Sequence, residues 1–402
     1  MSAGMGIYRD EMDVSYAVDF SRDREPTQKR SRYPEYRRKG SAPARVNGMH
    51  CRRNKRWTWG SGRGARMQNM RAFAGSLAFA VASMATVCMG GTFLTISNTS
   101  NSASSPSGLG AVSSVYRMSD TETTNAEYVA FLNSVAKSSD PFGLYNVASG
   151  TSVNGGIIRT GSAGNFTYAV KTDIPNRGTM PVNFVSWFDA ARYVNWLQTG
   201  STEAGAYTLS GQTSGPMPAR NANAQFWLPN SNEWFKAAFY NPTGVNYNTW
   251  GTGGNVKPTA TASNTNPAAN YSQVVNGGSA AVTGLNSVTN YSASLSAYGL
   301  YNATGSVWEF VDSGTTAGTT TARVFGGSWR TTNTNLDLYA STQASPFFSS
   351  WNTASEFDQL GFRVAAVPEP GTIALAGVGI AGLAGLDWMK RRKKRLAARQ
   401  AA

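Results

Sequence analysis

Apolar residues recur at helical spacing in three stretches of the middle of the chain, and a helix-capping signal precedes each stretch. The three cap pairs, in chain order, are Thr124 with Glu127, Ser186 with Asp189, and Asn230 with Glu233. Gly200 stands where the second helix should end, and Pro242 follows the third. The pattern therefore predicts three amphipathic helices.

The segments between the predicted helices are rich in Gly, Asn and Thr, with short strand-like runs such as residues 165–170. The sequence has no repeat of 20–50 residues, which disfavours a solenoid or a propeller. We therefore expect an α+β domain with much irregular structure, beginning near Val115. Residues 241–295 carry little charge and are expected to form a long surface excursion, and residues 89–114 read as a Ser/Asn/Gly linker.

The formal net charge of +14 comes from the two ends of the 402-residue chain. Residues 1–88 hold 17 Lys and Arg against 7 Asp and Glu, whereas residues 89–366 hold 12 against 13. A protein that binds nucleic acid needs a basic face that displaces counterions from phosphates. The central region does not have this charge, so we expect no nucleic-acid partner.

The central region also has no soft or imidazole ligands, because the only His is His50 and the only Cys are Cys51 and Cys88. Residues 89–402 therefore cannot supply a Cys or His nucleophile, a Ser-His-Asp triad, a zinc site or thiolate-bound copper. A metal in this region would have to be held by oxygen atoms.

Residues 67–88 have the features of a signal peptide, because basic residues precede an apolar run at 72–87 and small residues follow near Ala85. An uncleaved membrane anchor is the alternative. Residues 1–66 form a basic extension in front of this segment. We interpret it as lying upstream of a true start at Met67 or Met70, and the alternative is a disordered cytoplasmic tail.

Residues 367–395 combine Pro368-Glu369-Pro370, an apolar stretch at 373–386 and a basic cluster at 390–395. This order resembles the PEP-CTERM sorting signal. The resemblance implies processing by a membrane enzyme of the exosortase type and placement at the surface of a Gram-negative-type envelope. The basic cluster would stay cytoplasmic, leaving residues 89–366 outside. A plain single-pass anchor is the alternative.

Six blocks in the central region resemble the formylglycine-generating enzyme (sulfatase-modifying factor, FGE-sulfatase) family, and they occur in the family's order. The blocks are residues 122–128, 181–187, 227–234, 298–310, 326–329 and 361–364. The resemblance spans residues 115–366 and implies a C-type-lectin-like α+β fold.

Fold alone does not establish activity. Active members of the family oxidise a substrate Cys with copper held by two thiolates, and these positions here are Thr331 and Leu336. Neither side chain can bind copper(I), which needs soft sulfur. Related sulfoxide synthases use iron on a His cluster, which residues 89–402 cannot provide. We therefore expect no copper, zinc or iron and no oxidase activity.

Calcium needs only oxygen ligands, so a family calcium site can survive these losses. The resemblance places one on Asn302, Gly305, Val307 and Glu309 and a second on Asn270 and Tyr271. The second site has no clear acidic ligand in residues 272–288. The alternative is that Asn302 and Glu309 only satisfy loop backbone groups.

Three further sets of residues attract a functional interpretation. We expect about five of seven tryptophans to be buried, the seven being Trp187, Trp196, Trp227, Trp234, Trp308, Trp329 and Trp351. Only Trp351 and Trp250, which is not one of the seven, are expected to be exposed enough to stack on sugars. Arg363 is predicted to be a buried structural residue paired with a carboxylate. The acids Asp312, Glu356 and Asp358 are predicted to lie on the surface and not to form a glycosidase pair.

Together these features predict an exported, surface-sorted, non-catalytic module that binds extracellular matrix, such as the polysaccharide of a biofilm, or surface proteins. One alternative is an enzyme of the sulfatase-modifying-factor type, or a maturation factor, that acts without the copper cysteine pair. Another is a filler unit of a surface layer.

Overall fold

The computed structural model describes residues 91–105, 107–261, 267–272, 283–312, 319–331 and 349–368, all within one compact unit, Val81–Ala402. The extension 1–66, the signal peptide 67–88 and the C-terminal apolar stretch lie outside the described residues. Among those that are described, no helix has the length and hydropathy needed to cross a bilayer.

All three predicted helices are confirmed, and each has its capping box. They are α1 (Asn125–Val135), α3 (Trp187–Thr199) and α4 (Ser231–Phe239). At the N-terminus of α3, the Ser186 hydroxyl accepts from the Asp189 amide at 3.1 Å and donates to the Asp189 carboxylate at 2.7 Å. Gly200 ends this helix in the left-handed conformation, φ 74°. Two shorter helices were not predicted, α2 (Val147–Thr151) and η1 (Arg177–Thr179).

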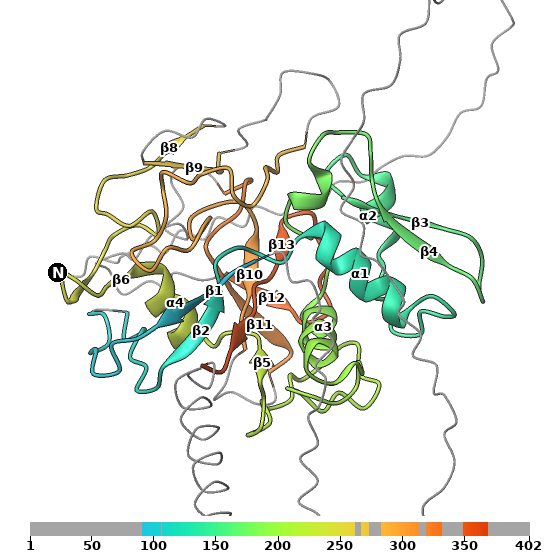
Figure 1. Ribbon diagram of the computed structural model, residues 1–402, viewed down its shortest axis with the longest axis horizontal. Helices are drawn as coiled ribbons and strands as arrows, with labels where there is room; N and C mark the ends of the chain where they lie inside the picture. The colour runs from blue at the N-terminus through green and yellow to red at the C-terminus, as the bar shows by residue number, and fades with distance from the viewer. Residues whose placement is uncertain are drawn as a thin grey trace, which may run out of the picture. The chain divides into compact units, whose positions relative to one another are not determined.

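Two small four-stranded sheets form the centre of the domain (Figure 1). The first has the order β1-β2-β14-β5, built from Phe93–Ile96, Tyr116–Ser119, Ala365–Ala366 and Phe226–Trp227. The second has the order β12-β11-β10-β13, built from Ser349–Asn352, Thr321–Phe325, Trp308–Phe310 and Leu360–Gly361. The pairs within both sheets are antiparallel except β10 with β13.

Three two-stranded pairs lie outside these sheets (Figure 1). They are β3 (Ile157–Thr160) with β4 (Thr167–Val170), β6 (Tyr240–Asn241) with β7 (Asn246–Tyr247), and β8 (Thr259–Ala260) with β9 (Ala268–Ala269). Strand β4 falls in the predicted run at 165–170. Helix α1 packs against β4 and α3, α3 against β5, and α4 against β11. A single large apolar cluster joins both sheets to these helices.

Residues 89–114 are not a free linker, which corrects the sequence prediction. They contain β1, whose Ile96 is fully buried, and β1 pairs with β2. The rest of the segment is held by α4, because Lys236 Nζ donates to the carbonyls of Asn98 (3.0 Å) and Val112 (3.3 Å). Composition alone indicated disorder, whereas the segment is stabilised by pairing with β2 and by Lys236, which lies more than a hundred residues away.

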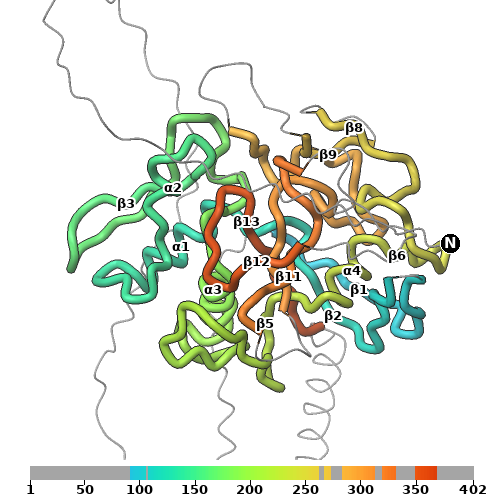
Figure 2. Tube along the Cα trace, turned by 180° about the vertical axis from the view of Figure 1, so that it is seen from behind, coloured from blue at the N-terminus to red at the C-terminus, as the bar shows by residue number. Residues whose placement is uncertain are grey.

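The segment 241–295 is also more buried than a surface excursion, where the structure describes it. Trp250, Ala269 and Tyr271 form a small apolar cluster of their own, and Leu285 joins a second one with Trp329. Trp250 is 7% exposed, so the expectation that it is accessible for stacking was wrong. Figure 2 shows β6, β8 and β9, which belong to this segment, from behind.

Candidate functional site

The first candidate site surrounds Thr331, at the end of the loop that follows β11. Thr331 is 5% exposed, and its hydroxyl accepts a hydrogen bond from the Ser328 amide at 2.8 Å. The Ser328 hydroxyl, itself fully buried, donates to Gln359 Oε1 at 3.1 Å. The Thr331 hydroxyl therefore closes the turn at Ser328, and the Ser328 hydroxyl holds this turn against the segment before β13.

Polar side chains from three distant segments surround this loop. Asp358 accepts from Arg330 Nη2 at 2.6 Å and from Asn154 Nδ2 at 2.6 Å. The Arg330 guanidinium also lies over the Trp329 ring, 4.5 Å from its centroid. Asn183 donates to the Asn154 and Asp358 carbonyls, and its Oδ1 is buried with no hydrogen-bond partner among the described residues. The arrangement is an ordered polar surface.

Chemically, this arrangement does not activate a nucleophile. A serine or threonine hydroxyl needs an adjacent base, and no such contact is found for Ser328 or Thr331 among the described residues. The only carboxylate in the cluster, Asp358, is paired with Arg330.

The second candidate site is the predicted calcium stretch, where the structure gives Glu309 a different partner. The Glu309 carboxylate is fully buried and accepts from Arg363 Nε and Nη2, each at 2.5 Å, and from Trp234 Nε1 at 2.6 Å. The prediction that Arg363 is buried and paired with a carboxylate is confirmed. Burial lowers the pKa of Arg363, but Glu309, with smaller contributions from the charges of Glu122 and Asp120, raises it, and the net shift is upward, so the guanidinium stays charged.

The other predicted calcium residues lie around this ion pair. Asn302 Nδ2 donates to Glu122 Oε2 and to the Val288 carbonyl, both at 3.0 Å. Gly305 has a φ of 84°, and a Cβ at this position would lie 2.2 Å from the Asn270 carbonyl oxygen. Val307 is fully buried. The four residues follow one another into β10, and the only carboxylate among them, Glu309, is paired with Arg363.

Glu122 is a buried acid that sequence reasoning missed. It is 1% exposed, and its Oε1 has no hydrogen-bond partner among the described residues. Burial, with a smaller contribution from Glu309, raises the pKa of Glu122 to about 7, although Arg363 acts in the opposite direction. It belongs to the block at 122–128, but no residue spacing connects it to Asn302, which lies 180 positions away.

A calcium ion fits Glu309 poorly, because the ion would compete with a bidentate guanidinium for the same carboxylate. Glu122 is the acid in this cluster that retains an unpartnered oxygen. No group of three His, Cys, Asp or Glu suitable for a metal occurs among the described residues. The calcium site therefore stays a prediction, and the structure indicates a competitor for its acidic ligand.

The second predicted calcium site consists of Asn270 and Tyr271. Asn270 Nδ2 donates to the Gly284 carbonyl at 2.8 Å, and its buried Oδ1 has no hydrogen-bond partner among the described residues. The Tyr271 hydroxyl donates to the Pro258 carbonyl at 2.7 Å. Residues 273–282, between these positions and Gly284, lie outside the described part of the chain.

The predictions for tryptophans and acids have mixed outcomes. Of the seven tryptophans, five are buried as expected, namely Trp187, Trp227, Trp234, Trp308 and Trp329, and the other two, Trp196 and Trp351, are half-buried. Asp312 was expected on the surface but is 1% exposed, because the Tyr207 hydroxyl donates to it at 3.3 Å inside the core. Glu356 and Asp358 bond to different asparagines, Asn146 and Asn154.

Comparison with known proteins places this geometry in a family. The model of the sulfatase-modifying factor enzyme 1-like domain (FGE-sulfatase) matches residues 76–367. The chain belongs to this family. The PEP-CTERM protein-sorting motif matches residues 366–393, which indicates export and cell-surface sorting and implies processing by an exosortase. The FGE-sulfatase match begins inside the predicted signal peptide and includes β1, upstream of the expected start near Val115.

Several solved structures are similar to this FGE-sulfatase domain at low sequence identity. CarF is 17% identical, with a TM-score of 0.38 over 64% of this chain and 87% of that one. Treponema denticola variable protein 1 is 18% identical, with a TM-score of 0.37 over 69% and 95%. PvdO from Pseudomonas aeruginosa is 13% identical, with a TM-score of 0.32 over 69% and 92%. No curated protein matches the chain.

The copper chemistry of the FGE-sulfatase family does not fit this chain. Thr331, at the first copper position, presents a hydroxyl that already caps the Ser328 loop. Leu336, at the second position, lies outside the described residues, but a leucine side chain has no donor atom. Neither side chain offers the thiolate that copper(I) requires.

Proposed function

We propose that this protein is an exported, non-catalytic binding module that acts at the cell surface and holds a component of the extracellular matrix. The observation that carries the proposal is the state of Thr331. Its hydroxyl is buried and engaged with the Ser328 amide, at a position where the oxidases of the family need a copper thiolate.

The surroundings of Thr331 support binding over catalysis. Arg330, whose side chain is 47% exposed, lies over the buried Trp329 ring and pairs with Asp358. Phe357, 47% exposed, packs against Trp351 with ring centroids 5.1 Å apart and adds apolar area next to it. Fixed polar groups beside an exposed aromatic ring are the usual composition of a recognition surface.

The test is retention of the full chain, purified in detergent, on a column of the producing organism's own extracellular polysaccharide. We expect retention, and we would run it with calcium and with a chelator to test the calcium site separately. Passage through the column in both buffers would refute matrix binding. Ordered self-assembly without any ligand would instead favour a surface-layer role.

A second assay addresses the enzymatic alternative. The full chain, loaded with copper, is incubated with a Cys-containing peptide, and peptide oxidation is followed by mass spectrometry. We expect no oxidation and no bound copper. The double variant Thr331→Cys/Leu336→Cys serves as the matched control for copper binding. Oxidation by the wild-type chain would overturn the non-catalytic proposal.

A further inference from the structure

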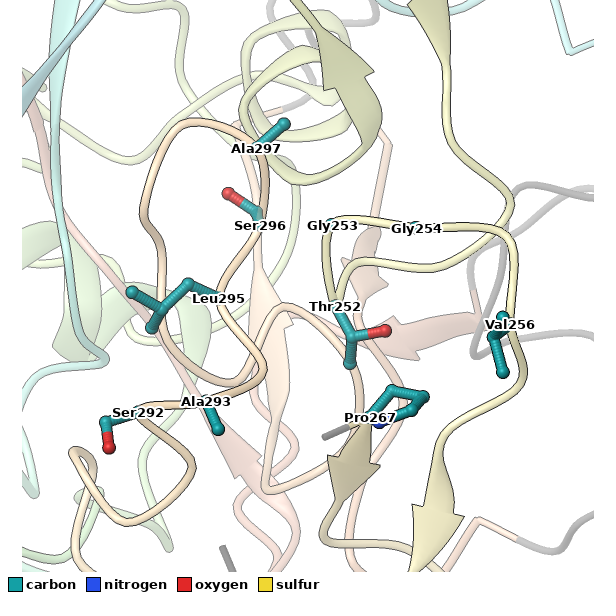
Figure 3. A pocket seen from close by; sticks show the side chains of 10 residues that line it. All are labelled: Thr252, Gly253, Gly254, Val256, Pro267, Ser292, Ala293, Leu295, Ser296 and Ala297. Atoms are coloured by element: carbon teal, nitrogen blue, oxygen red, sulfur yellow. The ribbon is translucent and has the colours of Figure 1, made fainter. Parts of the chain in front are cut away.

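Cavities in the domain differ in what their walls can recognise. The cavity in Figure 3, of about 610 Å³, lies between the loops at 252–256 and 292–297, and none of its ten lining residues is ionisable or aromatic. A smaller cavity, of about 290 Å³, lies between α2 and β3, and its wall includes Arg159 and Tyr145. Because a few fixed polar groups set the orientation of a bound ligand, the smaller cavity is the stronger candidate for a binding site.

Arg159 is held in place by aromatic rings. Its guanidinium carbon lies 4.5 Å from the centroid of the Phe166 ring and 4.9 Å from that of the Tyr145 ring. Arg159 is also opposite Tyr168 in the register of β3 and β4, and its guanidinium lies near the Tyr168 hydroxyl. Contacts between a cation and ring faces are favourable, so this guanidinium has a defined position before any ligand arrives.

Arg159 has no acidic partner among the described residues. Asp140, an acid near this cluster, instead accepts the amides of Leu144 and Tyr145 at 2.8 and 3.0 Å. No nitrogen of Arg159 is a buried atom without a partner, so its remaining donors reach the solvent. A fixed cation that the fold does not neutralise can accept an external anion. Five other described arginines each pair with a carboxylate, namely Arg177, Arg192, Arg220, Arg330 and Arg363.

The rest of the cavity wall is mainly apolar and ordered. Val147 is 59% exposed at the first position of α2, and Ile158 is half-buried on β3. Helix α2 packs closely on Tyr145, because a Cβ at Gly150 would lie 2.5 Å from the Tyr145 hydroxyl oxygen. The Asn146 side chain caps this helix through a hydrogen bond of 2.7 Å. A site that is already ordered loses less free energy when a ligand binds.

One cation beside an apolar wall defines the chemistry of the ligand. The planar guanidinium of Arg159 fits a carboxylate, which it can hold through two parallel hydrogen bonds. The cavity volume is just below the range of about 300–1,000 Å³ that is typical of small-molecule sites, so it suits a single ring-sized group. A uronic acid residue combines both features, because its ring presents C–H groups to an apolar wall and its carboxylate projects from one carbon of that ring.

We propose that the cavity beside Arg159 binds a uronate residue of an acidic matrix polysaccharide. The proposal rests on the proposed function, because it names the class of matrix component that the module binds. The site differs from the predicted calcium stretch in that the protein itself supplies the cation. An acidic peptide presents the same carboxylate without the rigid ring, and the experiment separates the two.

The experiment measures binding of two uronate trimers, one of galacturonate and one of mannuronate, to the full chain by calorimetry. A chelator is present so that no metal ion can bridge. We expect at least one trimer to bind, with an affinity that falls as the salt concentration rises. Its methyl ester should bind about tenfold more weakly or worse, as loss of a charge-assisted hydrogen bond implies. Equal binding by the ester, tighter binding by a peptide of three glutamates, or no binding of either trimer would overturn the proposal.

Two substitutions at Val147 test the site without changing Arg159. Val147→Glu places a carboxylate in the wall of the same cavity, where it would neutralise Arg159 and repel the uronate, so binding should weaken about tenfold or more. Val147→Gln makes a change of the same shape without the charge and should bind like wild type. Both variants should fold, because Val147 is exposed and an acid in the first turn of a helix is favourable.

A substitution of Arg159 itself separates geometry from charge. Arg159→Lys keeps the positive charge but removes the planar fork, so binding should again weaken about tenfold or more. Arg117→Lys is the matched control, because Arg117 also lies over a ring, 5.2 Å from the Phe93 centroid, but on β2. Undiminished binding of the trimer by Val147→Glu or by Arg159→Lys would overturn the proposal.

The polysaccharide column distinguishes this failure from failure of the proposed function. If wild type and Val147→Glu are retained equally, matrix binding stands and the cavity beside Arg159 is not its site. If wild type itself is not retained, matrix binding falls, whatever the cavity does with free uronate trimers.

Discussion

The buried pair between Glu309 and Arg363 makes a strong prediction about stability. Glu309→Gln keeps the shape of the side chain but removes its charge, so Arg363 loses the carboxylate that it contacts at two points. The side chains of both residues are at most 1% exposed, so water cannot replace that partner. Removal of one member of a buried pair costs about 3–5 kcal/mol.

For a domain of this size, that loss corresponds to a decrease in Tm of about 6–20 °C. The assay is thermal unfolding of the full chain with calcium and with a chelator. Asp173→Asn is the control, because Asp173 pairs with Arg177 but its side chain is 41% exposed. Exposed pairs contribute about 0–1 kcal/mol, so this variant should melt close to wild type.

The calcium arm tests the reasoning directly. If Glu309 acts mainly as the partner of Arg363, the destabilisation is the same in both buffers. A loss below about 1 kcal/mol, or one that disappears in the chelator, would refute the argument that Arg363 and not calcium neutralises this carboxylate.

Three further predictions concern the same domain. The pKa of Glu122 is raised from 4.5 to about 7, so its contribution to stability is complete below pH 4.5 and is lost as the pH rises through 7. When denaturant unfolding is measured from pH 4 to 8, the free energy of unfolding should therefore decline less for Glu122→Gln than for wild type. Ser186→Ala removes both hydrogen bonds to Asp189 and should cost about 1–2 kcal/mol in the same denaturant assay, with Ser186→Thr restoring most of it. Gly305→Ala should cost about 2 kcal/mol or more by thermal unfolding, because the φ of Gly305 is positive and the Asn270 carbonyl oxygen would lie 2.2 Å from the new Cβ. Gly254→Ala is the control, because its new Cβ meets no atom within 4 Å and the change should be neutral.

The helices could be predicted from sequence because their signals are local. Each cap residue bonds to a backbone amide three positions away, so Ser186 and Asp189 report on the start of α3 without any knowledge of the rest of the fold. Strand β1 has no such signal. Its stability comes from pairing with β2, so the composition of residues 89–114 was misleading.

The candidate site was predictable only in part, for the same physical reason. Arg363 could be expected to pair with a carboxylate, but the identity of Glu309, 54 positions earlier, depends on how β10 and β13 lie side by side. The unpartnered oxygen of Glu122 is likewise a property of the assembled loops. Residue types excluded copper, but they could not show which oxygen atoms lack partners.

The position of β14 has a consequence for how the protein is processed and held. Ala365 and Ala366 pair with β2 on one side and β5 on the other, and the Val367 amide still donates to the Gln225 carbonyl at 3.0 Å. The match to the sorting motif begins at Ala366, the last residue of this inner strand. A cut on the N-terminal side of Ala365 would remove the strand that joins β2 to β5, so the fold itself limits how closely a processing enzyme can trim. Any tension on the C-terminal tether is likewise applied to the middle of a sheet, where two neighbouring strands share the load.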